Sequence, residues 1–137
     1  MVVIDIDNLI VGRVATSIAK QALLGEKVDV INCEKGILVG KKEMILTKYK
    51  EKKKRGNPLK GPFIPTMPDR FVRRIIRNML PFKQDKGKRA FKNIMCYIGT
   101  PDSLKDKKVE TIKKFHISNS KSVKYIRIGE LCRLVKK

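Results

Sequence analysis

Residues 2–32 read VVIDIDNLIVGRVATSIAKQALLGEKVDVIN, and the rest of the fold builds on this unit. Apolar, β-branched side chains dominate 2–6 and 28–32, which is typical of strands covered on both faces. Between them, apolar side chains recur at helical spacing from Val11 to Leu23, and Gly25 follows where a glycine commonly ends a helix. Two strands joined by a helix form a right-handed crossover and lie parallel. The stretch therefore predicts an α/β fold.

Further elements follow, separated by one long irregular segment. Residues 56–68 hold four prolines and two glycines, which exclude regular structure. A loop of this length is usually functional or disordered. The length of the chain predicts one domain over 1–137, with a basic extension at about 48–92. The patterns predict helices at 41–54 and 129–135, strands at 93–98 and 122–128, and a polar, poorly periodic segment at 102–121.

The segment 68–81 predicts a helix with two contrasting sides. Pro68 suits a helix start and Pro81 stops it. One side carries only arginines and no carboxylate, whereas a solvated helix face usually mixes charges. Guanidinium groups match phosphate oxygens in geometry and charge, so this side is predicted to meet a polyanion. The apolar side holds Phe71, Val72, Ile75, Ile76, Met79 and Leu80, and the opposite side holds Arg70, Arg73, Arg74 and Arg77.

The overall charge supports a polyanionic partner. The chain has 33 Lys and Arg against 13 Asp and Glu, a formal net charge of +20. Residues 1–40 carry a net charge of −1, so 41–137 carry +21. Neutralising such a surface along a phosphate backbone relieves self-repulsion and releases counterions. No apolar run approaches the roughly 18 residues that span a bilayer, and the start lacks a basic signal-peptide region, so we expect a cytoplasmic protein.

The cations cluster along the predicted extension. They include the dense run from Lys48 to Arg55, the arginine side of 68–81 and a group around Gly87. At this density Lys and Arg make sequence-independent phosphate contacts, and no basic helix has the pattern of a major-groove reader, so folded RNA is the expected partner. The candidate RNA-binding residues are Lys41, Lys42, Lys48, Lys50, Lys52, Lys53, Lys54, Arg55, Lys60, Arg70, Arg73, Arg74, Arg77, Lys83, Lys86, Lys88 and Arg89.

Aromatic residues leave two alternatives open. No aromatic pair marks adjacent strands, so stacking on single-stranded bases is not the main interpretation. Phe63 and Phe82 flank basic loops. Either they insert into RNA or they anchor those loops onto the protein.

The sequence offers little for catalysis, cofactors or metals. Gly36 to Lys42 resembles a P-loop, but three residues separate its glycines where four are needed and Lys42 replaces the required Ser or Thr. His116 is the single histidine, and Asp5 and Asp7 suit a turn or N-cap better than a metal site. We expect no cofactor, metal, catalytic residue or small-molecule substrate. Cys33, Cys96 and Cys132 lack zinc-site spacing and are expected to be buried thiols.

Several short motifs, in their order and spacing along the chain, resemble those of the L-thirteen family of large-subunit ribosomal proteins. The resemblance covers the first strand to about Pro101, and the short form with Gly61-Pro62-Phe63 is similar to archaeal members. It implies a three-layer α/β/α domain with a four-stranded, mainly parallel sheet, and a non-catalytic protein that binds large-subunit rRNA beside neighbouring ribosomal proteins, not as an obligate homo-oligomer. The motifs are Gly12–Ala19, Ile31–Lys35 with Gly40-Lys41, Pro68 with Arg70, Arg77–Pro81, Gly87–Ala90, and Tyr97 with Gly99 and Pro101.

Two other functions stay open at this point. One is an RNA-processing enzyme on a similar fold, which requires a convergent acid, base or metal group. The other is a regulatory binder of messenger RNA. RNA cleavage in the presence of magnesium tests the first, and competition between rRNA and a message tests the second.

Overall fold

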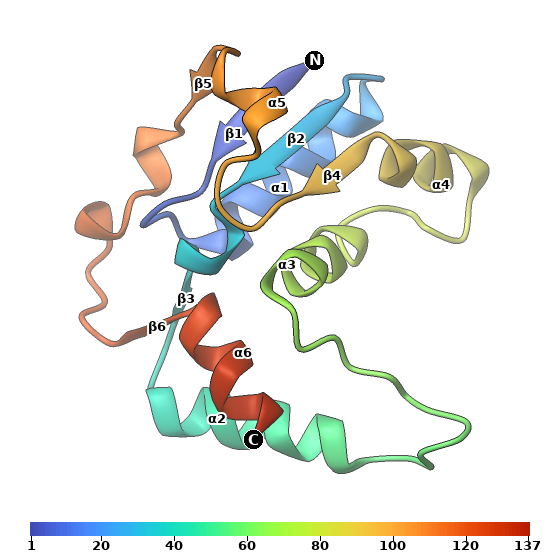
Figure 1. Ribbon diagram of the computed structural model, residues 1–137, viewed down its shortest axis with the longest axis vertical. Helices are drawn as coiled ribbons and strands as arrows, with labels where there is room; N and C mark the ends of the chain where they lie inside the picture. The colour runs from blue at the N-terminus through green and yellow to red at the C-terminus, as the bar shows by residue number, and fades with distance from the viewer.

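The computed structural model describes all of residues 1–137, and a parallel sheet of four strands lies at its centre (Figure 1). Strands β1 and β2 pair from Val2 opposite Val28 to Asp5 opposite Ile31. This confirms the α/β prediction made from residues 2–32. The order is β4-β2-β1-β5, with β1 (Val2–Asp5), β2 (Val28–Ile31), β4 (Ile94–Cys96) and β5 (Val109–Glu110).

Helix α1 (Val11–Leu23) makes the predicted crossover between β1 and β2. Gly25 follows the helix with φ of +96°, a left-handed conformation that a glycine adopts without strain. The side chains at helical spacing are buried against the sheet, as the sequence pattern predicts. They are Val11, Val14, Ala15, Ile18, Ala19 and Ala22.

Helices cover both faces of the sheet, which confirms the three-layer architecture. Helix α1 lies behind the sheet in Figure 1 and packs with α3 (Pro68–Arg77) and α4 (Asp85–Lys92). The other face is covered by α5 (Asp102–Lys105), whose Leu104 is buried with Val3 and Ile31. The larger core therefore lies on the α1 side.

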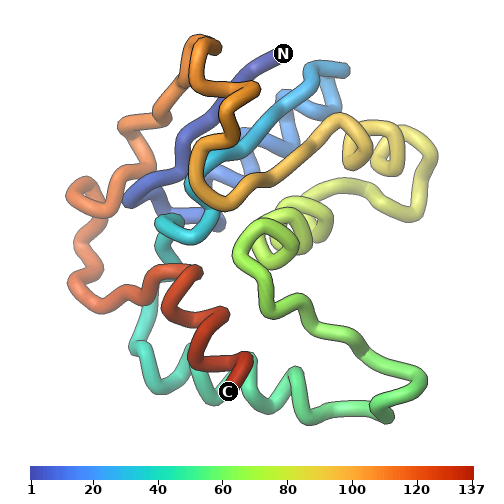
Figure 2. The backbone as a smooth tube through the Cα atoms, viewed as in Figure 1, coloured from blue at the N-terminus to red at the C-terminus, as the bar shows by residue number.

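A second, smaller sheet connects the two ends of the chain. Strand β3 (Ile37–Val39) pairs antiparallel with β6 (Tyr125–Arg127). Helices α2 (Lys42–Lys54) and α6 (Ile128–Lys136) continue directly from these strands and pack together. The tube in Figure 2 shows α2 and α6 side by side, below the parallel sheet.

The strand expected at 122–128 is shorter than predicted and belongs to this second sheet. The fourth parallel strand is instead β5, within the segment 102–121 that appeared aperiodic. Both residues of β5 are exposed, so no alternation of apolar and polar side chains marks them. The same segment holds two single 3-10 turns, Lys113–Phe115 and Ile117–Asn119, and a further one follows β2 at Cys33–Lys35.

The arginine helix ends three residues earlier than its apolar pattern suggests. Helix α3 stops at Arg77, and Leu80 reaches the core from the turn that follows. Helix α4 was not predicted at all, because only Gly87 and Ala90 are buried along it. No helix of the structure has both the length and the apolar character needed to cross a membrane.

Candidate nucleic-acid interface

The two sides of α3 face different surroundings. Phe71, Val72 and Ile76 are buried, so the apolar side packs on the core as predicted. The Arg70 side chain is exposed and takes part in no hydrogen bond or ion pair. The four arginines do not, however, share one environment.

Arg73 is directed into the protein. Its Nε donates to the carbonyl of Ile94 at 3.1 Å and Nη2 donates to the carbonyl of Phe91 at 3.5 Å. The guanidinium carbon also lies 4.4 Å from the centre of the Phe91 ring. These contacts fasten α3 to the end of α4 and the beginning of β4.

Arg77 and Phe82 hold the turn between α3 and α4. The guanidinium carbon of Arg77 lies 3.9 Å from the centre of the Phe82 ring, within the range of a cation–π contact. Phe82 also meets the edge of Phe91, with ring centres 5.5 Å apart. Of the two alternatives for Phe82, the structure supports anchoring.

Arg74 links α3 to the long loop. Its Nη1 donates to the carbonyl of Phe63 at 2.9 Å. The Phe63 side chain itself is 71% exposed, so it does not anchor the loop in the core. Phe63 remains available for insertion into RNA.

The loop from 56 to 67 has internal order despite its prolines and glycines. The N–H and the carbonyl of Asn57 both bond to the backbone of Gly61, and Asn57 Oδ1 accepts from Leu59 N. Gly56 has φ of +89°, and a Cβ there would lie 2.0 Å from the Gly61 carbonyl oxygen. Only glycine fits this close approach, so the turn presents Lys60 in a defined position.

Several cations of α2 are engaged within the protein. Lys53 Nζ donates to the carbonyls of Val135 and Lys136, where α6 leaves its last carbonyls unpaired. Lys42 forms an ion pair with Glu130. Lys52 lies over the Tyr49 ring, 5.3 Å from its centre. Lys53 therefore stabilises α6, a contact that no sequence pattern indicates.

The remaining candidates are exposed and have no ion pair or side-chain hydrogen bond within the protein. Lys88, by contrast, pairs loosely with the exposed Asp85 at 3.6 Å. The unpaired set extends from the start of α2 through the loop and α3 to α4, and all of its members except Lys41 lie on the extension predicted at about 48–92. These residues are Lys41, Lys48, Lys50, Lys54, Arg55, Lys60, Arg70, Lys83, Lys86 and Arg89.

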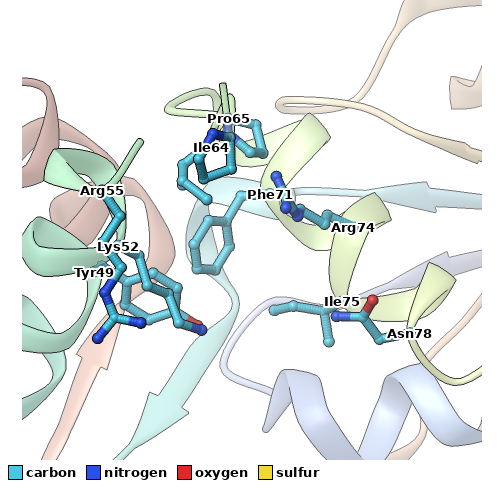
Figure 3. A pocket seen from close by; sticks show the side chains of 10 residues that line it. Tyr49, Lys52, Arg55, Ile64, Pro65, Phe71, Arg74, Ile75 and Asn78 are labelled. Atoms are coloured by element: carbon cyan, nitrogen blue, oxygen red, sulfur yellow. The ribbon is translucent and has the colours of Figure 1, made fainter. Parts of the chain in front are cut away.

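A pocket of about 330 Å³ opens between α2, α3 and the loop (Figure 3). Its aromatic wall is Tyr49 against Phe71, with ring centres 5.0 Å apart and ring planes at 57°. Every charged residue that lines it is a cation. The lining is Tyr49, Lys52, Arg55, Pro62, Ile64, Pro65, Phe71, Arg74, Ile75 and Asn78.

The remaining polar candidates form structural contacts. Asp5 Oδ1 accepts from Asn32 Nδ2 and from the N–H of Asp7, both at 2.9 Å. Glu34 Oε2 accepts from the N–H of Gly99 at 3.0 Å. These bonds join the carboxyl ends of β1, β2 and β4, which explains the motifs around Asn32 and Gly99 by folding.

The P-loop-like glycines and His116 lie in ordinary packing. A Cβ on Gly36 would lie 2.6 Å from Cγ2 of Val11, so Gly36 allows β3 to approach α1 and does not cradle a phosphate. His116 Nδ1 lies 2.8 Å from Ser118 Oγ, a contact between neighbours on one turn. No group of three or more His, Cys, Asp or Glu side chains is placed to hold a metal ion.

The three cysteines are buried and unpaired, as expected. The neighbouring Cys96 thiol and burial raise the pKa of Cys33 well above its usual range. Burial, with a smaller contribution from Asp69, raises the pKa of Cys132 to about 11. Both thiols are held in the neutral form, which suits packing and not nucleophilic chemistry.

The fold and this surface together define a small α/β protein with a strongly basic extension. A family model described as "Ribosomal protein L13" matches residues 1–103. The chain belongs to the ribosomal protein L13 family, which confirms the resemblance drawn from its motifs. The family consists of ribosomal proteins and not of enzymes, so the RNA-processing alternative is set aside.

Curated archaeal relatives extend the match to nearly the whole chain. The large ribosomal subunit protein uL13 of Methanopyrus kandleri is 42% identical over 131 residues, covering 94% of this chain and 82% of the relative. The protein of the same name from Methanosarcina barkeri is 40% identical over 132 residues, covering 96% and 94%. That of Methanococcus maripaludis is 41% identical over 139 residues, covering 98% and 97%.

Proposed function

We propose that this chain is a structural constituent of the large ribosomal subunit in the cytoplasm, where it binds folded rRNA through phosphate contacts. The observation that carries the proposal is the set of unpaired cations on α2, the loop, α3 and α4. Unpaired, exposed Lys and Arg side chains retain all their donors for phosphate oxygens. Family membership supports the ribosomal setting, because the relatives are named as large-subunit proteins.

The parallel sheet and α1 serve as the platform for this surface. Residues 1–40 carry a net charge of −1 and supply half of the 24 buried residues of the main core, whereas the extension carries the dense clusters of cations. Neighbouring large-subunit proteins are further partners in this setting, and the chain acts as a single copy. Its contribution is to hold rRNA segments in place, with no chemical step.

Ultraviolet crosslinking in cell extract tests the proposal when both the crosslinked RNA positions and the crosslinked peptides are identified. The recovered RNA should be large-subunit rRNA, and the crosslinked peptides should come mainly from 41–92. Recovery of messenger RNA instead, or of peptides confined to 1–40, would contradict it.

A further inference from the structure

We propose that the pocket between α2, α3 and the loop binds one unpaired nucleotide of the rRNA, with the base inside and its phosphate at the basic rim. The inference rests on the proposed function and deepens it. It adds a pocket for a single base to a surface whose proposed contacts are mainly with RNA phosphates.

The size and walls of the pocket suit a planar, partly apolar group. Its volume of about 330 Å³ lies at the small end of ligand sites, which run from about 300 to 1,000 Å³. Ile64 and Pro65 from the loop face Phe71 and Ile75 from α3, as Figure 3 shows. Flat aromatic and aliphatic walls of this kind accept an unstacked base.

The polar groups at the pocket favour a nucleotide over an apolar side chain. Arg55 and Arg74 lie at opposite sides of the opening, and no carboxylate lines it. Arg74 uses one nitrogen on the Phe63 carbonyl and keeps its other N–H donors. The Asn78 side chain lines the pocket and forms no hydrogen bond within the protein, so its amide is free to pair with the edge of a base.

The pocket also explains why the loop is ordered. Arg74 and the Asn57–Gly61 turn hold Ile64 and Pro65 across from Tyr49 and Phe71. A loop ordered in advance loses less conformational entropy when a ligand binds. The base would therefore enter a site that already has its shape.

A variant that fills the pocket without changing charge tests the inference. Ile64→Trp puts a large ring in the pocket, and Leu24→Trp makes a matched change outside the extension, where Leu24 is 77% exposed. Stacking of one base is worth about 1–3 kcal/mol, so Ile64→Trp should weaken binding to transcribed large-subunit rRNA by about 5- to 150-fold. Leu24→Trp should stay within about twofold of wild type.

Two further measurements separate this inference from the proposed function. The salt dependence of binding should change by less than about one unit in Ile64→Trp, because most phosphate contacts remain. Photocrosslinking of the wild-type complex should attach a nucleotide to Tyr49 or Phe71. If Ile64→Trp destabilises the fold, Asn78→Trp fills the pocket from its exposed α3 side and should weaken binding similarly.

Defined results would overturn the inference. One is unchanged affinity in a folded Ile64→Trp or Asn78→Trp protein, with no nucleotide crosslink in the pocket. Another is a crosslink in assembled subunits between the pocket and a side chain of a neighbouring protein, which would make a protein the occupant. If the affinity for rRNA also stays unchanged when the cations of the extension are replaced, the proposed function itself fails. That outcome is distinct from failure of the pocket inference.

Discussion

The guanidinium group of Arg77 stacks on Phe82, with its carbon 3.9 Å from the ring centre. Arg70, two turns earlier on α3, is exposed and has no partner in the protein. The arginine side of this helix is therefore divided. Arg73 and Arg77 fix the turn and β4, whereas Arg70 stays exposed to solvent.

Replacing Phe82 with Ala should lower stability. The change removes the stacking surface of Arg77 and the edge contact with Phe91, so the free energy of unfolding should fall by about 2 kcal/mol. Phe63→Ala is the matched control, because Phe63 is 71% exposed and its loss should cost less than about 0.5 kcal/mol. Urea unfolding measures the free energy of unfolding of both variants. Equal decreases in the two variants would show that Phe82 does not anchor the turn.

Substitutions at Arg73 and Arg70 should affect different properties of the protein: its stability and its RNA binding, respectively. Arg73→Ala should lower the free energy of unfolding by about 1–3 kcal/mol, because the carbonyls of Ile94 and Phe91 lose their donor. Arg73→Lys should recover little of this lost stability, because an ammonium group cannot reproduce the planar, forked geometry of a guanidinium group. Arg70→Ala should leave stability unchanged and weaken RNA binding. Thermal melting and filter binding measure the two effects, and a stable Arg73→Ala protein would refute the anchoring role.

Stability should fall in alkali partly because of Cys132. Its pKa is raised to about 11, mainly by burial, from the usual value near 9. A group with a raised folded-state pKa contributes stability fully below the unfolded pKa, and this stability is lost as the pH rises through the folded pKa. The contribution should therefore decline between about pH 9 and 11, by up to about 2 kcal/mol.

The Cys132→Ala variant supplies the control for that decline. Without the thiol, the free energy of unfolding should vary less with pH over the same window. Urea unfolding at half-unit pH steps compares the two proteins. Identical pH profiles would show that Cys132 does not titrate differently in the folded state.

Elements with a periodic or continuously apolar sequence were predictable, and short elements with mostly exposed side chains were not. The apolar spacing from Val11 to Leu23 and the alternation of Arg and apolar residues in 68–81 both indicate buried helix faces, because each pattern covers several turns. Strand β5 has two exposed residues, and helix α4 buries only Gly87 and Ala90, so neither carries a periodic signal. A Cβ on Gly87 would lie 2.1 Å from the Pro81 carbonyl oxygen, a close packing that only the structure reveals.

The candidate interface was predictable in outline but not in detail. Charge density alone identifies the extension, because unpaired cations repel one another unless a polyanion binds them. It cannot show that Lys53 meets the carbonyls of α6 or that Arg73 meets those near β4. The pocket was missed because Tyr49 and Phe71 belong to different helices and meet only through the tertiary fold.

The most direct test of the central claim is the salt dependence of rRNA binding in two matched triple variants. One replaces Lys50, Lys54 and Arg70 of the extension with Ala, and the other replaces Arg13, Lys20 and Lys27. Each variant removes three positive charges, so the net charge changes equally. All six side chains are exposed, so the core is untouched. At about 0.7–0.9 units per phosphate contact, the extension variant should flatten the slope of log affinity against log salt by about two to three units, and the control should leave it unchanged. Equal slopes in the two variants would contradict the claim that the extension holds the RNA.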